Sequence, residues 1–102
     1  MTPIKLDLRT DLIKVIPEKL GSRTACRYSA PCAIGAMMTY DQRAQLVEVQ
    51  RDTREIGTLV AEGFVSVPAG QLRDFQGLQR AFDRSVPEFD LVLAELKEKY
   101  TI

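Results

Sequence analysis

The chain contains no histidine and no tryptophan, and only two cysteines occur among its 102 residues. Without histidine, the chain alone cannot form a Ser-His-Asp triad, a Cys-His pair or a His-ligated metal site. The cysteines are Cys26 and Cys32, and five residues separate them, a spacing that fits no common zinc motif. We therefore expect neither a metal nor a cofactor.

The chain also lacks an excess of charge of either sign, because 14 Lys and Arg residues balance 14 Asp and Glu residues. The first half carries a net charge of +3 and the second half −3. A nucleic-acid binder usually presents a strongly basic face, which this composition does not supply. The nearest basic patch is Lys14, Lys19, Arg23 and Arg27. A small nucleic-acid-binding regulator therefore remains only as a second alternative.

Long hydrophobic runs are missing too. A membrane-spanning helix needs about 18 or more consecutive apolar residues, and no such run occurs. The first residues, 1–5, lack the apolar core of a secretory signal, so we expect a cytoplasmic protein with no membrane partner. With 45% hydrophobic and 27% charged residues, the composition is that of an ordinary globular fold. We expect one domain spanning residues 1–102.

The first half of the chain gives mixed signals. Apolar residues alternate over 4–8, which is typical of an extended arm, and an apolar helical face follows over 10–20. Thr10 or Asp11 would cap that helix. Pro31 suits the first position of a second helix, predicted over 31–40. Residues 41–51 fit a short strand or a helical turn equally well.

The second half is clearer. Residues 52–55 have the D-x-x-E form of a capping box, which predicts a third helix ending at Gly63, and an extended link over 64–67 follows. Apolar residues recur at spacings of three and four along a fourth helix over 69–84. Ser85, followed by a proline and then Glu88, predicts the N-terminus of a last helix that ends near residue 100.

These patterns predict a mainly α fold: a compact domain of four to five helices, with or without a short two-stranded piece. The link between the last two helices is so short that they should pack as an antiparallel hairpin. Their apolar stripes supply the expected core, Phe75, Leu78, Phe82, Phe89, Leu93 and Leu96.

Two short motifs carry a family resemblance. Cys-Ala-Ile-Gly at 32–35 is followed by Leu-Gln-Arg-Ala-Phe-Asp at 78–83, with Ile-x-x-Leu-Val-x-x-Gly at 56–63 between them. This arrangement resembles a loosely defined group of small uncharacterised bacterial and phage proteins with the pattern C-A-[IL]-G, then L-Q-x-[AI]-H-D, then a final amphipathic helix. The resemblance spans about residues 25–100, and the group has no established activity to carry over.

The chain departs from that pattern at one position, where Phe82 replaces the histidine of His-Asp. A cysteine–histidine pair, if the group uses one, has lost its base in this member. Cys32, Gln79 and Asp83 are the possible ligand-contacting residues. Cysteine in an apolar setting is more often a small core residue, and Gln79 and Asp83 share a helix face that can hydrogen-bond a ligand or the amides of the Cys32 helix.

The favoured function is a small cytosolic protein-interaction module of phage or mobile-element type. It would bind and modulate another protein, for example as an inhibitor of a host defence or regulatory component, or assemble as a homo-oligomer. A cysteine-dependent enzyme using Cys32 is the first alternative. The predicted interface consists of apolar residues near element ends that we expect to be half covered: Met37, Met38, Tyr40, Phe64 and Val65.

Overall fold

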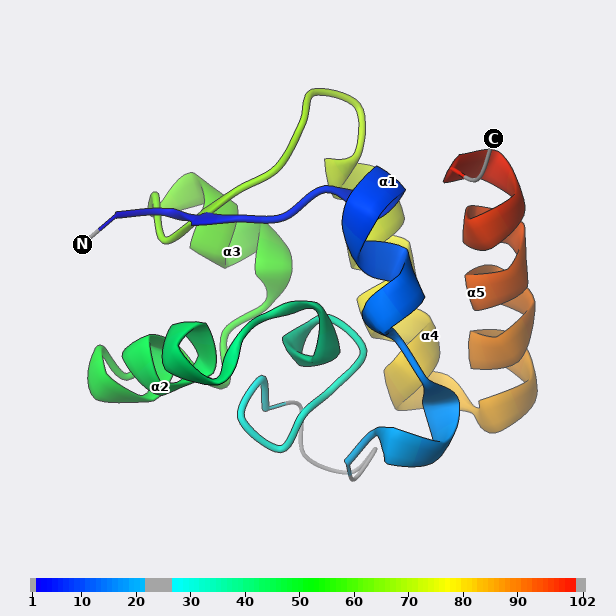
Figure 1. Ribbon diagram of the computed structural model, residues 1–102, viewed down its shortest axis with the longest axis horizontal. Helices are drawn as coiled ribbons and strands as arrows, with labels where there is room; N and C mark the ends of the chain where they lie inside the picture. The colour runs from blue at the N-terminus through cyan, green and yellow to red at the C-terminus, as the bar shows by residue number, and fades with distance from the viewer. Residues whose placement is uncertain (1, 22–26, 101–102) are drawn as a thin grey trace.

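The computed structural model describes residues 2–21 and 27–100, and helices dominate this part of the chain (Figure 1). The α-helices are α1 (Leu8–Asp11), α2 (Tyr40–Glu48), α3 (Ile56–Ala61), α4 (Leu72–Arg84) and α5 (Val86–Tyr100). Short 3₁₀ turns are η1 (Leu12–Lys14), η2 (Pro17–Lys19) and η3 (Gly35–Met37), and the strands are β1 (Ile4–Lys5) and β2 (Val65–Ser66). The predicted fold class, a mainly helical domain with a two-stranded piece, is confirmed.

Helices α4 and α5 form the predicted antiparallel hairpin (Figure 1). At its turn, Ser85 Oγ accepts a hydrogen bond from the Glu88 amide at 3.2 Å, so the predicted N-cap is present. The rings of Phe82 and Phe89 meet edge to face with their centroids 5.3 Å apart. All six predicted core residues are buried, as the spacing of their stripes requires.

The two-stranded piece is a parallel pair in which Ile4 lies opposite Val65. The Ile4 amide donates to the Phe64 carbonyl at 2.9 Å, and the Leu6 amide donates to the Ser66 carbonyl at 3.0 Å. Both predicted extended segments, residues 4–8 and 64–67, therefore contribute to it, although only two residues of each form the strand. The pair joins the beginning of the chain to the segment that leads into α4.

The predicted helix over 10–20 is wrong in its bounds. Helix α1 begins at Leu8, and Asp7, not Thr10 or Asp11, is its N-cap. The segment then tightens into η1 and, from Pro17, into η2. Proline lacks the amide that a continuous helix would need at this position, which explains the break.

The predicted helix over 31–40 is also wrong. Turns at residues 31, 33 and 34 lead into η3, and an α-helix begins only at Tyr40. Gly35 lies so close to the preceding loop that a Cβ at this position would stand 2.2 Å from the Tyr28 carbonyl oxygen. The small residues of the Cys-Ala-Ile-Gly motif thus allow a loop, not another helix, to approach closely.

Helix α2 begins at the last residue of this segment, Tyr40, after a capping box that the sequence prediction missed. Thr39 Oγ1 accepts from the Gln42 amide at 3.1 Å, and Gln42 Oε1 accepts from the Thr39 amide at 2.9 Å. The capping box predicted at residues 52–55 does not form. The Asp52 carboxylate accepts hydrogen bonds from the amide and hydroxyl of Ser29 instead, and α3 starts only at Ile56.

Candidate functional site

The structure gives Gln79 a structural role in the interior. This side chain is 6% exposed, and its Oε1 accepts from the Ile56 amide, the first amide of α3, at 2.8 Å. Its Nε2 donates to the Tyr28 hydroxyl at 3.0 Å, and that hydroxyl donates to the Arg54 carbonyl at 2.7 Å. Gln79 thus accepts the first amide of α3, and the predicted contact with the first-turn amides of a helix at Cys32 is wrong.

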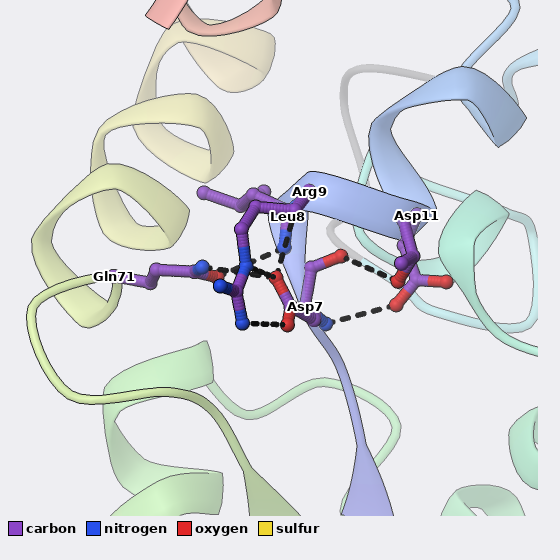
Figure 2. Close-up of polar contacts among 6 residues, drawn as sticks. Asp7, Leu8, Arg9, Asp11 and Gln71 are labelled. Carbon is purple, nitrogen blue, oxygen red and sulfur yellow. Dashed lines mark hydrogen bonds and ion pairs between the residues drawn. The ribbon is translucent and has the colours of Figure 1, made fainter. Parts of the chain in front are cut away.

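A second buried glutamine, Gln71, does the same for α1, and no sequence signal pointed to it (Figure 2). Its Oε1 accepts from the Leu8 amide at 2.9 Å, and its Nε2 donates to Asp7 Oδ1 at 3.0 Å. Arg9 also contacts this carboxylate, with Nη2 2.8 Å from Asp7 Oδ2. These hydrogen bonds, from the Arg9 side chain first and then from Gln71, hold the pKa of Asp7 far below its ordinary value.

Asp83 lies with Gln79 at a polar cleft of about 480 Å³ between the start of α3 and the outer side of α4. Glu55 and Arg80 also line this cleft. Partial burial, and then the negative charge of Glu55, raise the pKa of Asp83. The structure therefore brings two of the three predicted ligand-contacting residues together, with one of them already committed to the fold.

Cys32 is the third, and it lies in the core with 2% of its surface exposed. The Gly35 amide donates to its sulfur at 3.4 Å. The predicted burial is confirmed, and it supports a packing role rather than nucleophilic chemistry, which requires an accessible thiolate. Cys26 and Arg23 lie outside the described residues.

Of the five residues in the predicted interface, only Phe64 is half covered as expected. Met37, Met38 and Val65 are buried, so the expectation for these three is wrong. Their burial follows from η3 packing into the interior and from β2 pairing with β1. Phe64 is partly buried beneath the Arg51 guanidinium, which lies 5.5 Å from its ring centroid. Tyr40 alone among the five is well exposed, at 77%.

The structure offers a different apolar surface, a groove between the α1–η1 segment and the last turns of α5. We call it the Ile13 groove, and its volume is about 770 Å³. Ile13 is 81% exposed at its edge, whereas Leu8 and Leu12 at its base are buried. Its lining residues are Leu8, Arg9, Thr10, Leu12, Ile13, Lys97, Lys99 and Tyr100.

The charges at the Ile13 groove are one-sided, since none of the described residues that line it is acidic. Lys99 Nζ lies 2.9 Å from Asp74 Oδ2, behind the lining, and Tyr100 donates to the same oxygen. Burial alone would raise the pKa of Asp74, but the hydrogen bonds from Tyr100 and Lys99 lower it. The hydrogen bond to Asp74 in turn raises the pKa of Lys99.

The sequence prediction missed Ile13 as a surface residue because it assigned Leu12 and Ile13 to one inward helical face. Successive residues of a helix point about 100° apart, so two neighbours cannot both face the centre of the core. Leu12 is 5% exposed and Ile13 81% exposed, which shows which of them packs inward. The charged neighbour Lys14, half exposed and paired with Asp11, is the signal that could have indicated an outward turn.

Among the described residues, no helix combines the length and the apolar character needed to cross a bilayer. Comparisons of the chain with protein-family models, with curated proteins and with solved structures gave no match. The resemblance carried by residues 32–35 and 78–83 therefore stays a prediction.

Proposed function

We propose that this chain is a small cytosolic protein-interaction module of the phage or mobile-element type, which acts by a protein contact, either with another protein or with a second copy of itself. The single observation that supports it is the Ile13 groove. The Ile13 side chain is 81% exposed, so folding buries little of its apolar surface. It lies beside a concave surface with an apolar base. Exposed apolar surface rimmed by polar residues is typical of protein-binding sites.

The chemistry of the remaining surface supports binding over catalysis. Cys32 is buried, and the carboxylates of the polar cleft stand beside Gln79, which is engaged in holding α3. The groove, by contrast, is lined by aliphatic and aromatic carbon with cations at its rim, the composition of a peptide- or helix-binding groove.

Site-specific photo-crosslinking in the native host tests this proposal. A photoreactive amino acid replaces Ile13, and in a matched control it replaces Val47, which is 49% exposed on α2, away from the groove. We expect a discrete covalent adduct from position 13 and none above background from position 47. Adducts of equal yield from both positions, or from neither, would contradict a partner at the groove.

A further inference from the structure

The outer face of α5 carries an apolar residue surrounded by acidic ones. Leu91 is 60% exposed, and Glu95 and Glu98 follow it by four and seven positions, which places all three on one side of the helix. Both glutamates are exposed, and so is Ala94 beside them. We call this surface the Leu91 face.

In the part of the chain that the structure describes, the acidic residues of the Leu91 face are not ion-paired. This holds for Glu95, Glu98 and the neighbouring Asp90. The other acidic residue of α5, Glu88, is paired with Arg84 at 3.2 Å. The face therefore combines an exposed leucine with carboxylates that can form ion pairs with a partner.

The Ile13 groove has the opposite character. Its rim carries Arg9, Lys97 and Lys99, and Lys97 forms no ion pair within the described residues. Arg9 and Lys99 do have carboxylate partners, but both cations are more than half exposed, so they remain within reach of a second negative group. Complementary potentials of this kind set the register and orientation of a protein contact.

We propose that the occupant of the Ile13 groove is a second copy of this chain, which inserts its Leu91 face. This proposal rests on the proposed function, because it assigns the partner of the same groove. Leu91 would lie against Ile13 and Leu12, and Glu95 and Glu98 would face Lys97 and Arg9 of the other copy. A helix face laid into an apolar groove is a recurrent mode of recognition.

The two surfaces are different patches of one molecule, so the contact is heterologous. A pair of copies keeps one open groove, on one copy, and one open Leu91 face, on the other, and assembly continues until a ring closes or a chain of copies forms. This property separates the proposal from a symmetric dimer, in which the same patch meets itself. It also provides the test, because the groove and the Leu91 face can be disrupted separately, each by its own substitution.

Sedimentation velocity on the purified chain over a wide concentration range measures the assembly. The wild-type protein should grow beyond a dimer as its concentration rises. Ile13→Glu, which disables the groove, and Leu91→Glu, which disables the face, should each be monomeric. Both side chains are exposed, so both variants should keep the wild-type circular dichroism spectrum.

Mixing the two variants is the decisive step. The mixture holds one intact groove, on Leu91→Glu, and one intact face, on Ile13→Glu, so it should form a one-to-one heterodimer and grow no further. Val47→Glu, a charge placed on an exposed residue of α2, should assemble like the wild type. Glu95→Lys should weaken assembly about tenfold at low salt and less at high salt.

Three results would overturn the proposal: a wild-type chain that stays monomeric throughout, assembly that neither glutamate substitution affects, or a mixture that remains monomeric. The last would indicate a symmetric contact. The chain could be monomeric and still form an adduct with a host protein through the photoreactive residue at position 13. That result would contradict the self-assembly proposal and leave the proposed function standing. A monomeric chain with no adduct at position 13 removes both.

Discussion

Gln71, at the start of α4, and Gln79, in its middle, have the same role in different surroundings. Each side-chain oxygen accepts the first amide of a remote short helix, Leu8 of α1 or Ile56 of α3. The Gln71 amide nitrogen donates to the partly exposed carboxylate of Asp7, whereas that of Gln79 donates to the buried hydroxyl of Tyr28.

The first amide of a helix can therefore find its hydrogen-bond acceptor far along the chain. The surroundings then determine how much the contact contributes to the free energy of unfolding. Water can replace a lost partner where the site is partly exposed. In the interior, an unpaired donor bears its full desolvation cost. The Gln79 contact should therefore contribute more stability, and the Gln71 contact, which includes a carboxylate, should respond to pH.

The largest expected effect comes from Gln79→Met, which keeps the volume but removes both polar groups. The Ile56 amide and the Tyr28 hydroxyl each lose a buried partner, so the free energy of unfolding should fall by about 3 kcal/mol. Urea denaturation measures it. The matched control is Gln76→Met on the half-buried side of the same helix, which should cost about 0.5 kcal/mol or less.

Gln71→Met should have a smaller effect, about 1.5 kcal/mol by the same measurement. The Leu8 amide loses a buried acceptor, but Asp7 keeps its contacts with Arg9 and remains accessible to water. The two losses should add in the double variant, because the sites share no partner. If Gln71→Met proved as costly as Gln79→Met, exposure would not be what distinguishes the two contacts.

Gly77 lies between the two glutamines, and replacing it with alanine would raise the helix propensity of α4. Apart from its chain neighbours and its own helix backbone, a Cβ at this position would have no heavy atom within 4 Å, so there is room for a side chain. Gly77→Ala should raise the free energy of unfolding by about 0.8 kcal/mol, the difference in helix propensity. The gain should be the same with either glutamine replaced. A loss of stability would contradict the open space at this position.

The last contrast between the two glutamine contacts is their response to pH, which depends on Asp7. Its pKa is lower in the folded chain than in the unfolded one, so its contribution is present above about pH 4 and is lost as the pH falls below that value. Asp7→Asn should therefore flatten the acid decline in stability, and Gln79→Met should leave its slope unchanged. The slope should not vanish in Asp7→Asn, since the pKa of Asp74 is also lowered. Denaturation curves between about pH 5 and about pH 3 measure it. Equal slopes for wild type and Asp7→Asn would show that Asp7 contributes nothing.

The α4–α5 hairpin could be predicted because its signals are local. The stripe that includes Phe75 and Phe82 follows the helical period, and Ser85 caps the helix that it precedes. The start of α3 could not be found in the same way, because its first amide is satisfied by Gln79, 23 positions later. Asp52 has the right spacing for a local cap, but Ser29 takes its carboxylate.

The segment around Cys32 shows a second limit. Pro31 and the small residues after it fit the start of a helix, and only the close approach of the Tyr28 carbonyl to Gly35 reveals a tight loop. Thr39 and Gln42 did offer a local signal, the capping box of α2. The candidate surfaces followed the same rule: burial of Cys32 was predictable from its apolar neighbours, whereas the Ile13 groove depends on two segments distant in sequence.

The parallel pairing of β1 with β2 also has a consequence for the order of events during folding. The pairing of Ile4 with Val65 and the hydrogen bond of Leu8 with Gln71 can form only after residues 65 and 71 have been made. Residues 4–8 are therefore stabilised late. Contacts between residues so far apart form slowly, because a long loop must close before they can. The α4–α5 hairpin, whose contacts are local, can form without that delay. During synthesis, β1 and α1 would therefore lack these two partners until Val65 and Gln71 have been made.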